Sequence, residues 1–374
     1  MAKRVIISGG GTGGHIFPAV AIANALKLIA PDTEILFVGA KGRMEMEKIP
    51  ASGYKIIGLD IQGFQRKSLL KNILLPYKLL KSILKARSII KDFKPDVAVG
   101  VGGYASGPLL FAAGQLNIPY LIQEQNSYAG ITNKRLGKNA ERICVAFNGM
   151  SQFFPPQKIM LTGNPVRKES VNIINKRNAA MQEFELSPSK KTILVTGGSL
   201  GAGTLNKSII NDLDKIIKAD VQLIWQTGKY YYQSIISKLL GKEHFNIKIV
   251  EFLNRMDFAY AAADVIISRA GAGTIAELCM IKKPVILVPS PNVAEDHQTK
   301  NAVALANNRA ALIVEDKNAE HDLVDKVLSL INDDSKCQEL GQNIEKMALP
   351  NADEIIANEI LKISKYKSLI QEVV

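Results

Sequence analysis

The 374-residue sequence has few of the features that mark secreted, metal-binding or membrane-spanning proteins. Its three cysteines, Cys144, Cys279 and Cys337, lie far apart and form no C-x-x-C pair. Such cysteines are typical neither of a disulfide framework nor of a structural zinc site, and they favour a reducing cytoplasm. No run of about 18 apolar residues exists for a membrane span, and residues 5–7 are too short an apolar run for a signal peptide. We therefore expect a protein that is neither secreted nor integral to a membrane.

Acidic residues are scarce in the first half of the chain. Residues 1–163 contain 21 Lys and Arg against 9 Asp and Glu, which is a net charge of +12, whereas residues 164–374 contain 26 of each. No acid occurs between Asp60 and Asp92, where the basic residues are Arg66, Lys67, Lys71, Lys78, Lys81, Lys85, Arg87 and Lys91. So local an excess of positive charge indicates an anionic surface as partner.

Apolar side chains are interleaved with these basic residues, among them Phe64, Leu69, Leu70, Ile73, Leu74, Leu75, Leu79 and Leu80. This mixture over residues 63–91 predicts peripheral binding to an anionic membrane, with cations at the headgroups and apolar groups shallowly inserted. A nucleic-acid partner is not expected, because aromatics are few there and no nucleic-acid motif accompanies the segment. The alternative is that the leucines pack in a core and the lysines are only solvated.

Short apolar runs alternate with longer helical patterns along the whole chain. The runs are 4–8, 34–38, 96–101 and 119–123 in the first half, and 192–196, 221–226, 247–252, 264–268 and 284–289 in the second. Continuous apolar strands joined through helices predict parallel sheets covered on both faces, which is the α/β class.

The opening unit of the chain recurs at the start of the second half. VIISGGGTGGHIFPAVAIANAL (5–26) and ILVTGGSLGAGTLNKSII (193–210) both predict a strand, a glycine turn and a helix. This repeat predicts two Rossmann-like domains, 1–163 and 164–349, with a seam near GNPVR (163–167). A ligand is then expected in the cleft between the domains, near the carboxyl ends of the strands.

The first glycine turn matches G-x-G-x-x-G at Gly9, Gly11 and Gly14. A dinucleotide site also needs an acid just after the second strand, and residues 39–43 contain none, so NAD is disfavoured, although Lys41 and Arg43 leave NADP open. A third turn, RAGAGT (269–274), precedes a predicted helix. Its amides and Thr274 can meet a diphosphate, and Glu277 can accept hydrogen bonds from a ribose diol.

Six motifs in this order resemble the MurG family of bacterial lipid-linked N-acetylglucosaminyltransferases. They are GGTGGH (10–15), GGYASGP (102–108), QEQNSYAG (123–130), GNPVR (163–167), GGSLGA (197–202) and RAGAGT (269–274). The resemblance implies the GT-B fold, in which two Rossmann-like domains flank a cleft and a C-terminal helix, here 350–374, packs on the N-terminal domain. It also implies inverting transfer of GlcNAc from UDP-GlcNAc to the C4 hydroxyl of MurNAc in undecaprenyl-pyrophosphoryl-MurNAc-pentapeptide (lipid I), which forms lipid II for peptidoglycan synthesis.

The resemblance also implies where the substrates bind and where the enzyme works. The UDP-GlcNAc residues are Thr12, Gly13, Gly14, Asn126, Arg167, Ser199, Leu253, Ala272, Gly273, Thr274, Ile275, Ala276, Glu277 and Gln298. The predicted acceptor residues are Tyr104 and Ser106. The predicted membrane residues rest on the charge and apolar pattern of residues 63–91 and are Phe64, Lys71, Leu75, Lys78, Leu79, Lys81 and Lys85. The expected location is peripheral, on the cytoplasmic face of the bacterial inner membrane.

Displacement at an anomeric carbon needs a base for the incoming hydroxyl and charge stabilisation for the departing UDP. His15, at the opening of the first helix, is the first candidate base, and Glu124 is the second; His15 could instead cap the helix or bind a phosphate. We expect no metal and no cofactor. The one D-x-D sequence, Asp212-Leu213-Asp214, lies in a helical pattern with its acids on the polar side, so Arg167 and helix N-termini would neutralise the diphosphate.

Two other functions are compatible with parts of the sequence. Another GT-B protein, such as a UDP-GlcNAc 2-epimerase or a glycolipid galactosyltransferase, would share the glycine turns, but a 2-epimerase has no use for a basic apolar surface. A nucleotide-sensing membrane adaptor would keep the cleft without the chemistry. The polar set His15, Glu124, Asn126, Arg167, Glu277 and Gln298 favours the enzyme.

Overall fold

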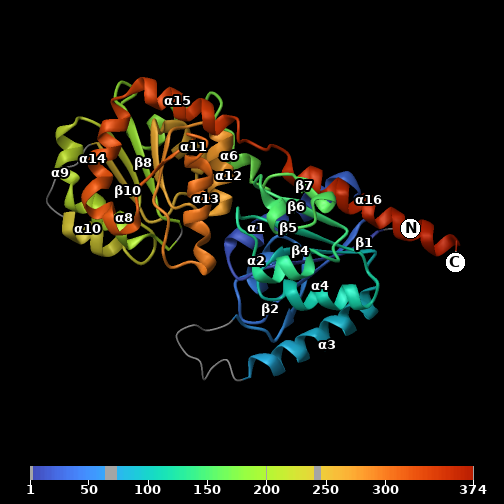
Figure 1. Ribbon diagram of the computed structural model, residues 1–374. Helices are drawn as coiled ribbons and strands as arrows, with labels where there is room; N and C mark the ends of the chain where they lie inside the picture. Colours follow the sequence, from blue (N-terminus) through green and yellow to red (C-terminus); the bar gives the residue numbers. More distant parts are fainter. Residues whose placement is uncertain (1–2, 64–73, 199, 240–245, 374) are drawn as a thin grey trace. The chain divides into compact units, whose positions relative to one another are not determined.

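The computed structural model describes residues 3–63, 74–198, 200–239 and 246–373, with the side chains of 294 and 365–373 left aside (Figure 1). The chain forms two compact units. The first comprises Met1–Val166 and Leu349–Val374, and the second comprises Arg167–Ala348. Each unit is built on its own sheet.

The first unit contains a seven-stranded parallel sheet with the strand order β3-β2-β1-β4-β5-β6-β7. Strand β1 lies in the middle, where Ile6 pairs with Leu36 of β2 on one side and Ala98 of β4 on the other. The strands are β1 (Arg4–Gly9), β2 (Glu34–Ala40), β3 (Lys55–Leu59), β4 (Val97–Gly102), β5 (Tyr120–Glu124), β6 (Arg142–Val145) and β7 (Ile159–Leu161).

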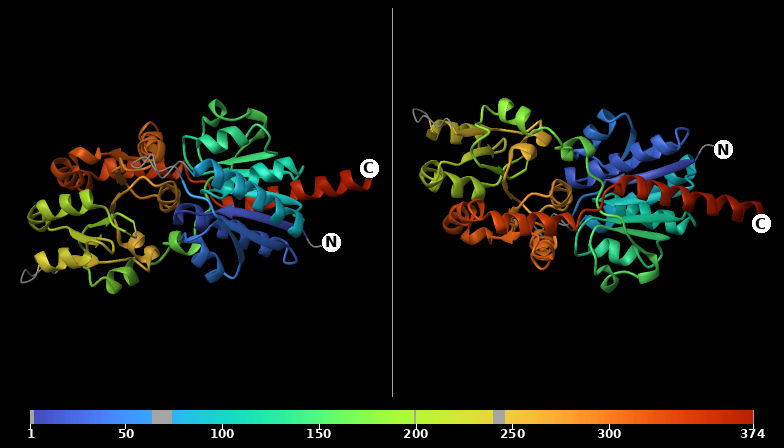
Figure 2. Two further views of the ribbon diagram at one scale, coloured as in Figure 1. Left: turned by 90° about the horizontal axis from the view of Figure 1, so that it is seen from below. Right: turned by 90° about the horizontal axis from the view of Figure 1, so that it is seen from above.

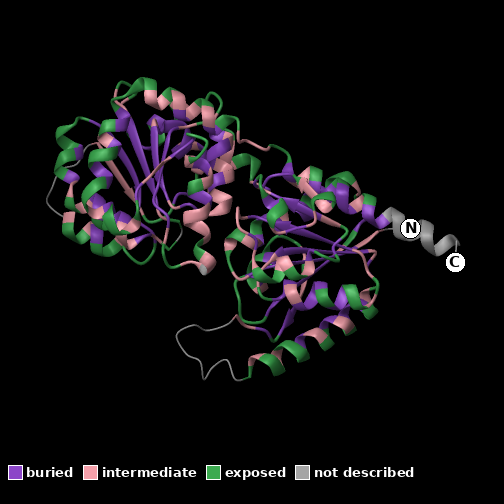
Figure 3. Cartoon of the chain, viewed as in Figure 1, coloured by how far each residue is buried: buried purple, intermediate pink, exposed green. Residues whose placement is uncertain are grey.

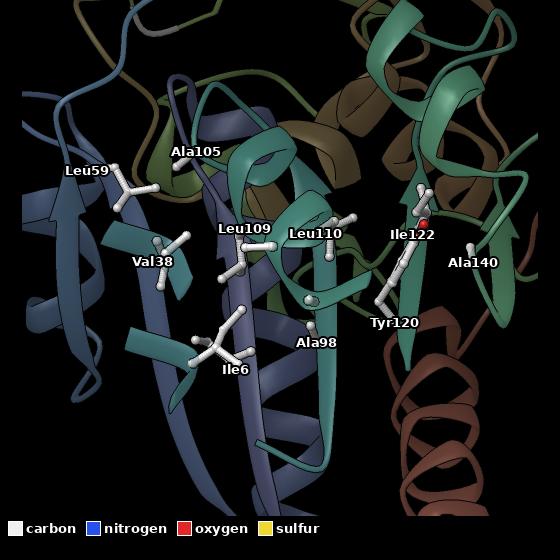
Figure 4. Close-up of a cluster of buried hydrophobic side chains, with 14 of the residues drawn as sticks. Ile6, Val38, Leu59, Ala98, Ala105, Leu109, Leu110, Tyr120, Ile122 and Ala140 are labelled. Carbon is white, nitrogen blue, oxygen red and sulfur yellow. The ribbon is translucent and has the colours of Figure 1, made fainter. Parts of the chain in front are cut away.

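Helices cover both faces of this sheet, which explains why its central strands carry apolar residues on both faces. Val5 and Ile7 point to one face, where they pack with Ile16 of α1 and Ile360 of α16. Ile6 points to the opposite face, where α3 and α4 supply the cover (Figure 4). The helices are α1 (Gly13–Ile29), α2 (Glu45–Ala51), α3 (Leu75–Phe93), α4 (Ser106–Gln115), α5 (Ile131–Leu136), η2 (Met150–Gln152), η3 (Pro156–Lys158) and α16 (Ala352–Val373).

The second unit repeats this plan with a six-stranded parallel sheet in the order β10-β9-β8-β11-β12-β13. Its strands are β8 (Thr192–Thr196), β9 (Gln222–Gln226), β10 (Ile247–Val250), β11 (Val265–Ser268), β12 (Val285–Leu287) and β13 (Leu312–Ile313). Its helices are α6 (Lys168–Val171), α7 (Arg177–Glu183), α8 (Gly203–Asn211), α9 (Leu213–Lys218), α10 (Tyr232–Leu239), α11 (Met256–Ala262), α12 (Ala272–Ile281), η4 (Ala294–Asp296), α13 (His297–Ala306), η5 (Asp316–Asn318), α14 (Ala319–Ile331) and α15 (Asp334–Glu345).

Both sheets therefore have the Rossmann strand order 3-2-1-4-5-6, counted within each unit, and the predicted α/β class with two Rossmann-like parallel sheets is confirmed. The central strands are buried in both units, and the exposed residues gather on the outer helices (Figure 3). Helix α16 belongs to the first unit and packs beside α1 (Figure 2).

The helix predicted across Asp212-Leu213-Asp214 is wrong in one respect. Helix α8 ends at Asn211 and α9 begins at Leu213, so Asp212 lies between two helices. Its carboxylate is 3.4 Å from Lys215 Nζ, and Asp214 is exposed on α9. Asp212 therefore lies at a helix junction, and Asp214 lies on a solvent-exposed helix face.

Candidate functional site

Two glycine turns interlock at the carboxyl edge of the first sheet. The Gly10 N–H, just after β1, donates to the Gly102 carbonyl at the end of β4 across 3.3 Å. Gly103 has φ +89°, and a Cβ there would lie 2.4 Å from the Gly10 carbonyl oxygen. A side chain at position 103 would therefore separate the two turns, because no neighbour can yield where the obstacle is backbone.

His15 lies in the first turn of α1, and β4 sets the orientation of its imidazole. Nδ1 is 3.2 Å from the Val101 carbonyl oxygen, which can only accept, so Nδ1 carries the proton. In the neutral ring Nε2 then holds the lone pair, which is the form that a general base requires. Gly102, with φ +108°, makes room for the ring, since a Cβ there would lie 2.6 Å from Nδ1.

The rest of the predicted turn is open to solvent. Thr12 occupies the N-cap position of α1 and is exposed, as is Gly14, while Gly13 is half-buried. The Thr12 carbonyl accepts the N–H groups of His15 and Ile16, each across 3.1 Å. Thr12, Gly13 and Gly14 are therefore accessible to a ligand and directly precede His15 in the chain.

Glu45 contacts this turn, although the sequence pattern did not single it out. Its carboxylate accepts the Gly11 N–H at Oε2 across 2.8 Å and the Ala40 N–H at Oε1 across 3.0 Å. An acid is thus present beyond β2, but it comes from the start of α2 and bonds to the chain itself. The Gly11 amide is already used, which gives a further reason against a dinucleotide in this turn.

Glu124, the second candidate base, is buried at 3% exposure at the end of β5. Oε1 accepts the backbone N–H and the side-chain amide of Asn126, and Oε2 accepts the Gly130 N–H and the side-chain amide of Asn133. Four donors around one carboxylate hold the segment between β5 and α5 in place. This bonding favours a positioning role for Glu124 and brings Asn126 to the same edge of the sheet.

Other residues of the motifs in the first unit are divided between surface and interior. Gln123 and Ser106 are buried at 1% and 3% exposure, and Gln123 donates to Asn164 across 2.8 Å, so both belong to the interior. Tyr104 is exposed, and the Arg43 guanidinium lies over its ring, 5.7 Å from the centroid. Of the predicted acceptor residues in GGYASGP, Tyr104 is therefore accessible and Ser106 is not.

In the second unit, the predicted ribose ligand Glu277 is held by a residue that the motifs did not reveal. The Tyr260 hydroxyl, on α11, donates to Glu277 Oε2 across 2.9 Å. Burial raises the pKa of the Glu277 carboxyl, while the bond from Tyr260 and the nearby Arg167 guanidinium oppose that rise. Glu277, Tyr260 and Arg167 therefore form one electrostatic group.

The turn before α12 leaves space beside this group. Gly271 is the N-cap of α12, and a Cβ added to Gly273 would meet no atom within 4 Å. Ala272, Gly273, Thr274 and Ala276 are half-buried, whereas Ile275 packs in the core. The start of α12 thus offers accessible backbone amides, while Ile275 contributes packing.

Three further predicted donor residues belong to the second unit. Gln298 Oε1 accepts the Ser290 N–H across 2.8 Å and so holds the loop after β12. Leu253 is buried just after β10. Ser199 lies outside the described residues. Gly201 has φ +83°, and a Cβ there would lie 2.1 Å from the Thr227 carbonyl oxygen.

Helix α3 carries the described part of the predicted membrane segment; Phe64 and Lys71 lie outside the described residues. Ala86 and Ile89 face the core, whereas Leu80 and Leu84, one turn apart, are each 58% exposed. Among the predicted residues, Leu79, Lys81 and Lys85 are exposed, while Leu75 and Lys78 are half-buried. Lys78 lies 4.0 Å from Asp60, and Lys85 donates to the Gly58 carbonyl across 2.8 Å.

Within the described ranges, no helix is both long and apolar enough to cross a membrane. The same residues include no group of three or more His, Cys, Asp or Glu side chains placed to hold a metal ion.

Models of one protein family match both units. The glycosyltransferase family 28 N-terminal domain matches residues 5–145, and the family 28 C-terminal domain matches residues 192–356. The chain belongs to glycosyltransferase family 28. The predicted relationship to MurG is confirmed by similar proteins and by a solved structure.

Two relatives are each named UDP-N-acetylglucosamine--N-acetylmuramyl-(pentapeptide) pyrophosphoryl-undecaprenol N-acetylglucosamine transferase. The protein from Parabacteroides distasonis is 56% identical, over 96% of the family 28 chain and 98% of its own length. The protein from Bacteroides thetaiotaomicron is 56% identical, over 97% of this chain and 98% of its own length.

Solved structures agree with the fold. Acinetobacter baumannii MurG superposes with a TM-score of 0.77 at 30% identity, covering 96% of the family 28 chain and 99% of its own. The UDP-GlcNAc 2-epimerase from Neisseria meningitidis reaches a TM-score of 0.65 at 18% identity, over 97% of this chain and 100% of its own. At that identity the epimerase shares the fold alone.

Proposed function

We propose that the chain transfers GlcNAc from UDP-GlcNAc to the C4 hydroxyl of MurNAc in lipid I, forming lipid II with inversion at the anomeric carbon. The structural observation that carries this proposal is the half-buried Glu277 carboxylate of α12, three residues after the RAGAGT turn, held by Tyr260. A carboxylate so placed can accept both hydroxyls of a ribose. The names and the 56% identity of the relatives support the same donor and acceptor.

The second unit is the proposed donor domain. Amides at the start of α12 and the Thr274 hydroxyl bind the diphosphate, because a helix N-terminus points its N–H groups and the positive end of its dipole at an anion. Arg167 adds positive charge, and its guanidinium already acts on the Glu277 carboxyl. The departing UDP is stabilised by these groups, so we propose that no metal ion is needed.

The first unit supplies the proposed base and the acceptor residues. Nε2 of His15 takes the proton from the C4 hydroxyl as its oxygen bonds to the anomeric carbon of GlcNAc. The bond from that carbon to the UDP oxygen breaks on the opposite face, and the electron pair leaves with UDP. The Val101 carbonyl keeps the proton on Nδ1 before this transfer, so that Nε2 is free to accept the new proton, and it still accepts from Nδ1 in the imidazolium that forms. Glu124 remains the alternative base.

Helix α3 is the proposed membrane contact, which would place the enzyme peripherally on the cytoplasmic face of the bacterial inner membrane. Exposed Leu80 and Leu84 alternate with Lys81 and Lys85 on this helix. Apolar groups can insert among the acyl chains while each lysine near an anionic surface contributes about 1 kcal/mol.

The decisive experiment combines purified protein, radiolabelled UDP-GlcNAc and a lipid I analogue, with and without EDTA. We expect labelled lipid II in both reactions. A protein that binds UDP-GlcNAc without forming lipid II would contradict the transferase. Activity that EDTA abolishes and that Mg²⁺ restores would contradict the metal-free mechanism alone.

A further inference from the structure

The carboxylate of Glu45 is enclosed by the glycine turn and the end of β2. The side chain is 1% exposed at the start of α2, yet its two oxygens reach the Gly11 and Ala40 amides. A Cβ added to Gly10 would lie 2.3 Å from Glu45 Oε1, and one added to Gly39 would lie 2.6 Å from Glu45 Cγ. Two glycines thus leave the space that this carboxylate fills.

We propose that Glu45 is a positioning residue for transfer, which holds the glycine turn so that His15 meets the acceptor hydroxyl in a fixed geometry. The inference rests on the proposed role of His15 as the base. Glu45 itself touches neither the donor nor the imidazole. It acts through Gly11, the residue before the Thr12 that opens α1.

The link from Glu45 to His15 is short and consists of hydrogen bonds. Gly11 has φ +85°, so the chain turns sharply there, and its amide is bound to Glu45 Oε2. The next residue, Thr12, accepts the His15 N–H with its carbonyl. Since the Val101 bond holds the other end of His15, the imidazole is located by β4 and by a turn that Glu45 anchors.

The position requires a carboxylate of this length. Both partners are N–H donors, so both side-chain atoms must accept. Glutamine has the same shape, but it presents an NH₂ group to one of the two amides and leaves that buried donor without an acceptor. Aspartate is one methylene shorter and does not span the distance between the turn and β2.

The test compares Glu45→Gln with Glu47→Gln, its exposed neighbour on α2. We expect Glu45→Gln to lower kcat roughly 10- to 100-fold, the effect of a small misplacement of a reacting group. KM for UDP-GlcNAc should change little, because the proposed donor residues of the second unit are untouched. Hydrogen exchange measured by mass spectrometry should be faster in the peptide that contains Gly11. Glu47→Gln should match the wild type in all three measurements.

A second variant keeps the proposal testable if Glu45→Gln fails to fold. Gly10→Ala leaves the charge of Glu45 in place but displaces the carboxylate with a methyl group, and it should reproduce the loss of kcat and the faster exchange. Wild-type kcat, or unchanged exchange despite a lower kcat, in either folded variant would overturn the proposal. If exchange and kcat change as expected while His15→Ala keeps full activity, the positioning role stands and the assignment of the base fails.

Discussion

The hydroxyl of Tyr260 donates to Oε2 of Glu277 across 2.9 Å, inside the second unit. Tyr260 is 1% exposed, and burial together with the Glu277 charge raises the pKa of its hydroxyl, so it stays protonated and can only donate to the carboxylate. The bond fixes the rotamer of Glu277 and leaves lone pairs on its carboxylate for a ligand. Tyr260 is thereby tied to the proposed ribose site without contacting the ribose.

Tyr260→Phe should weaken donor binding without removing catalysis. The phenyl ring fills the same space, and loss of one hydrogen bond of about 1 kcal/mol corresponds to roughly a fivefold rise in KM for UDP-GlcNAc. Steady-state kinetics measures this KM, with Tyr230→Phe, a substitution at an exposed tyrosine, as the control. An unchanged KM would show that Glu277 holds its position without this bond.

The same variant should shift the pH dependence. The bond from Tyr260 lowers the pKa of Glu277, so its removal leaves that pKa higher. Donor binding needs the ionised carboxylate, which is present above this pKa and lost as the pH falls through it. The acidic limb of kcat/KM should therefore move to higher pH in Tyr260→Phe. A shift to lower pH would contradict the proposed role of the Glu277 carboxylate.

Glu277→Gln should reduce discrimination between ribose and 2′-deoxyribose. A carboxylate that bonds to the ribose diol loses a partner when the 2′-hydroxyl is absent, so the wild type should prefer UDP to 2′-deoxy-UDP. We expect the preference to fall about tenfold in the variant, measured by calorimetric titration of both nucleotides. Equal preference in the two proteins would place Glu277 away from the ribose.

His15→Ala should lower kcat by roughly 10²- to 10⁴-fold if Nε2 takes the proton. His321→Ala, an exposed histidine of the second unit, is the matched control and should be fully active. A rise in KM with unchanged kcat would assign His15 to binding instead of proton transfer.

Glu124→Gln separates a positioning role from a base. The substitution places an NH₂ group against N–H donors that are bound to a carboxylate in the wild type. We therefore expect the free energy of unfolding in urea to fall by about 1.5–3 kcal/mol. A loss of kcat with wild-type stability would instead support Glu124 as the base.

Charge reversal on α3 should weaken membrane binding. We expect Lys78, Lys81 and Lys85 changed together to Glu to reduce co-sedimentation with anionic liposomes, and Leu80→Ser with Leu84→Ser to do so at constant charge. Reversal of Lys229 and Lys238, exposed in the second unit, is the control. Binding equal to the wild type in both α3 variants would contradict the proposed membrane face.

The central strands of both sheets were predictable because both of their faces are buried, which makes them continuous apolar runs. Strands β3, β6, β7 and β13 were missed. Three of them, β3, β7 and β13, lie at the sheet edges and are only partly buried, so no continuous buried run marks them. The helix expected through Asp212 is interrupted. Asp212 lies at the junction of α8 and α9, where its carboxylate is beside Lys215.

The sequence by itself determined the α/β class, the tandem repeat, the glycine turns and the polar residues of the motifs, because strand periodicity and turn chemistry depend on neighbours in the chain. Only the tertiary structure decided the partners of those residues. Glu45 reaches a turn 34 positions away, Val101 selects the His15 tautomer, and Tyr260 holds Glu277 from another helix. Such bonds depend on which strands and helices become neighbours, and no local pattern in the sequence records them.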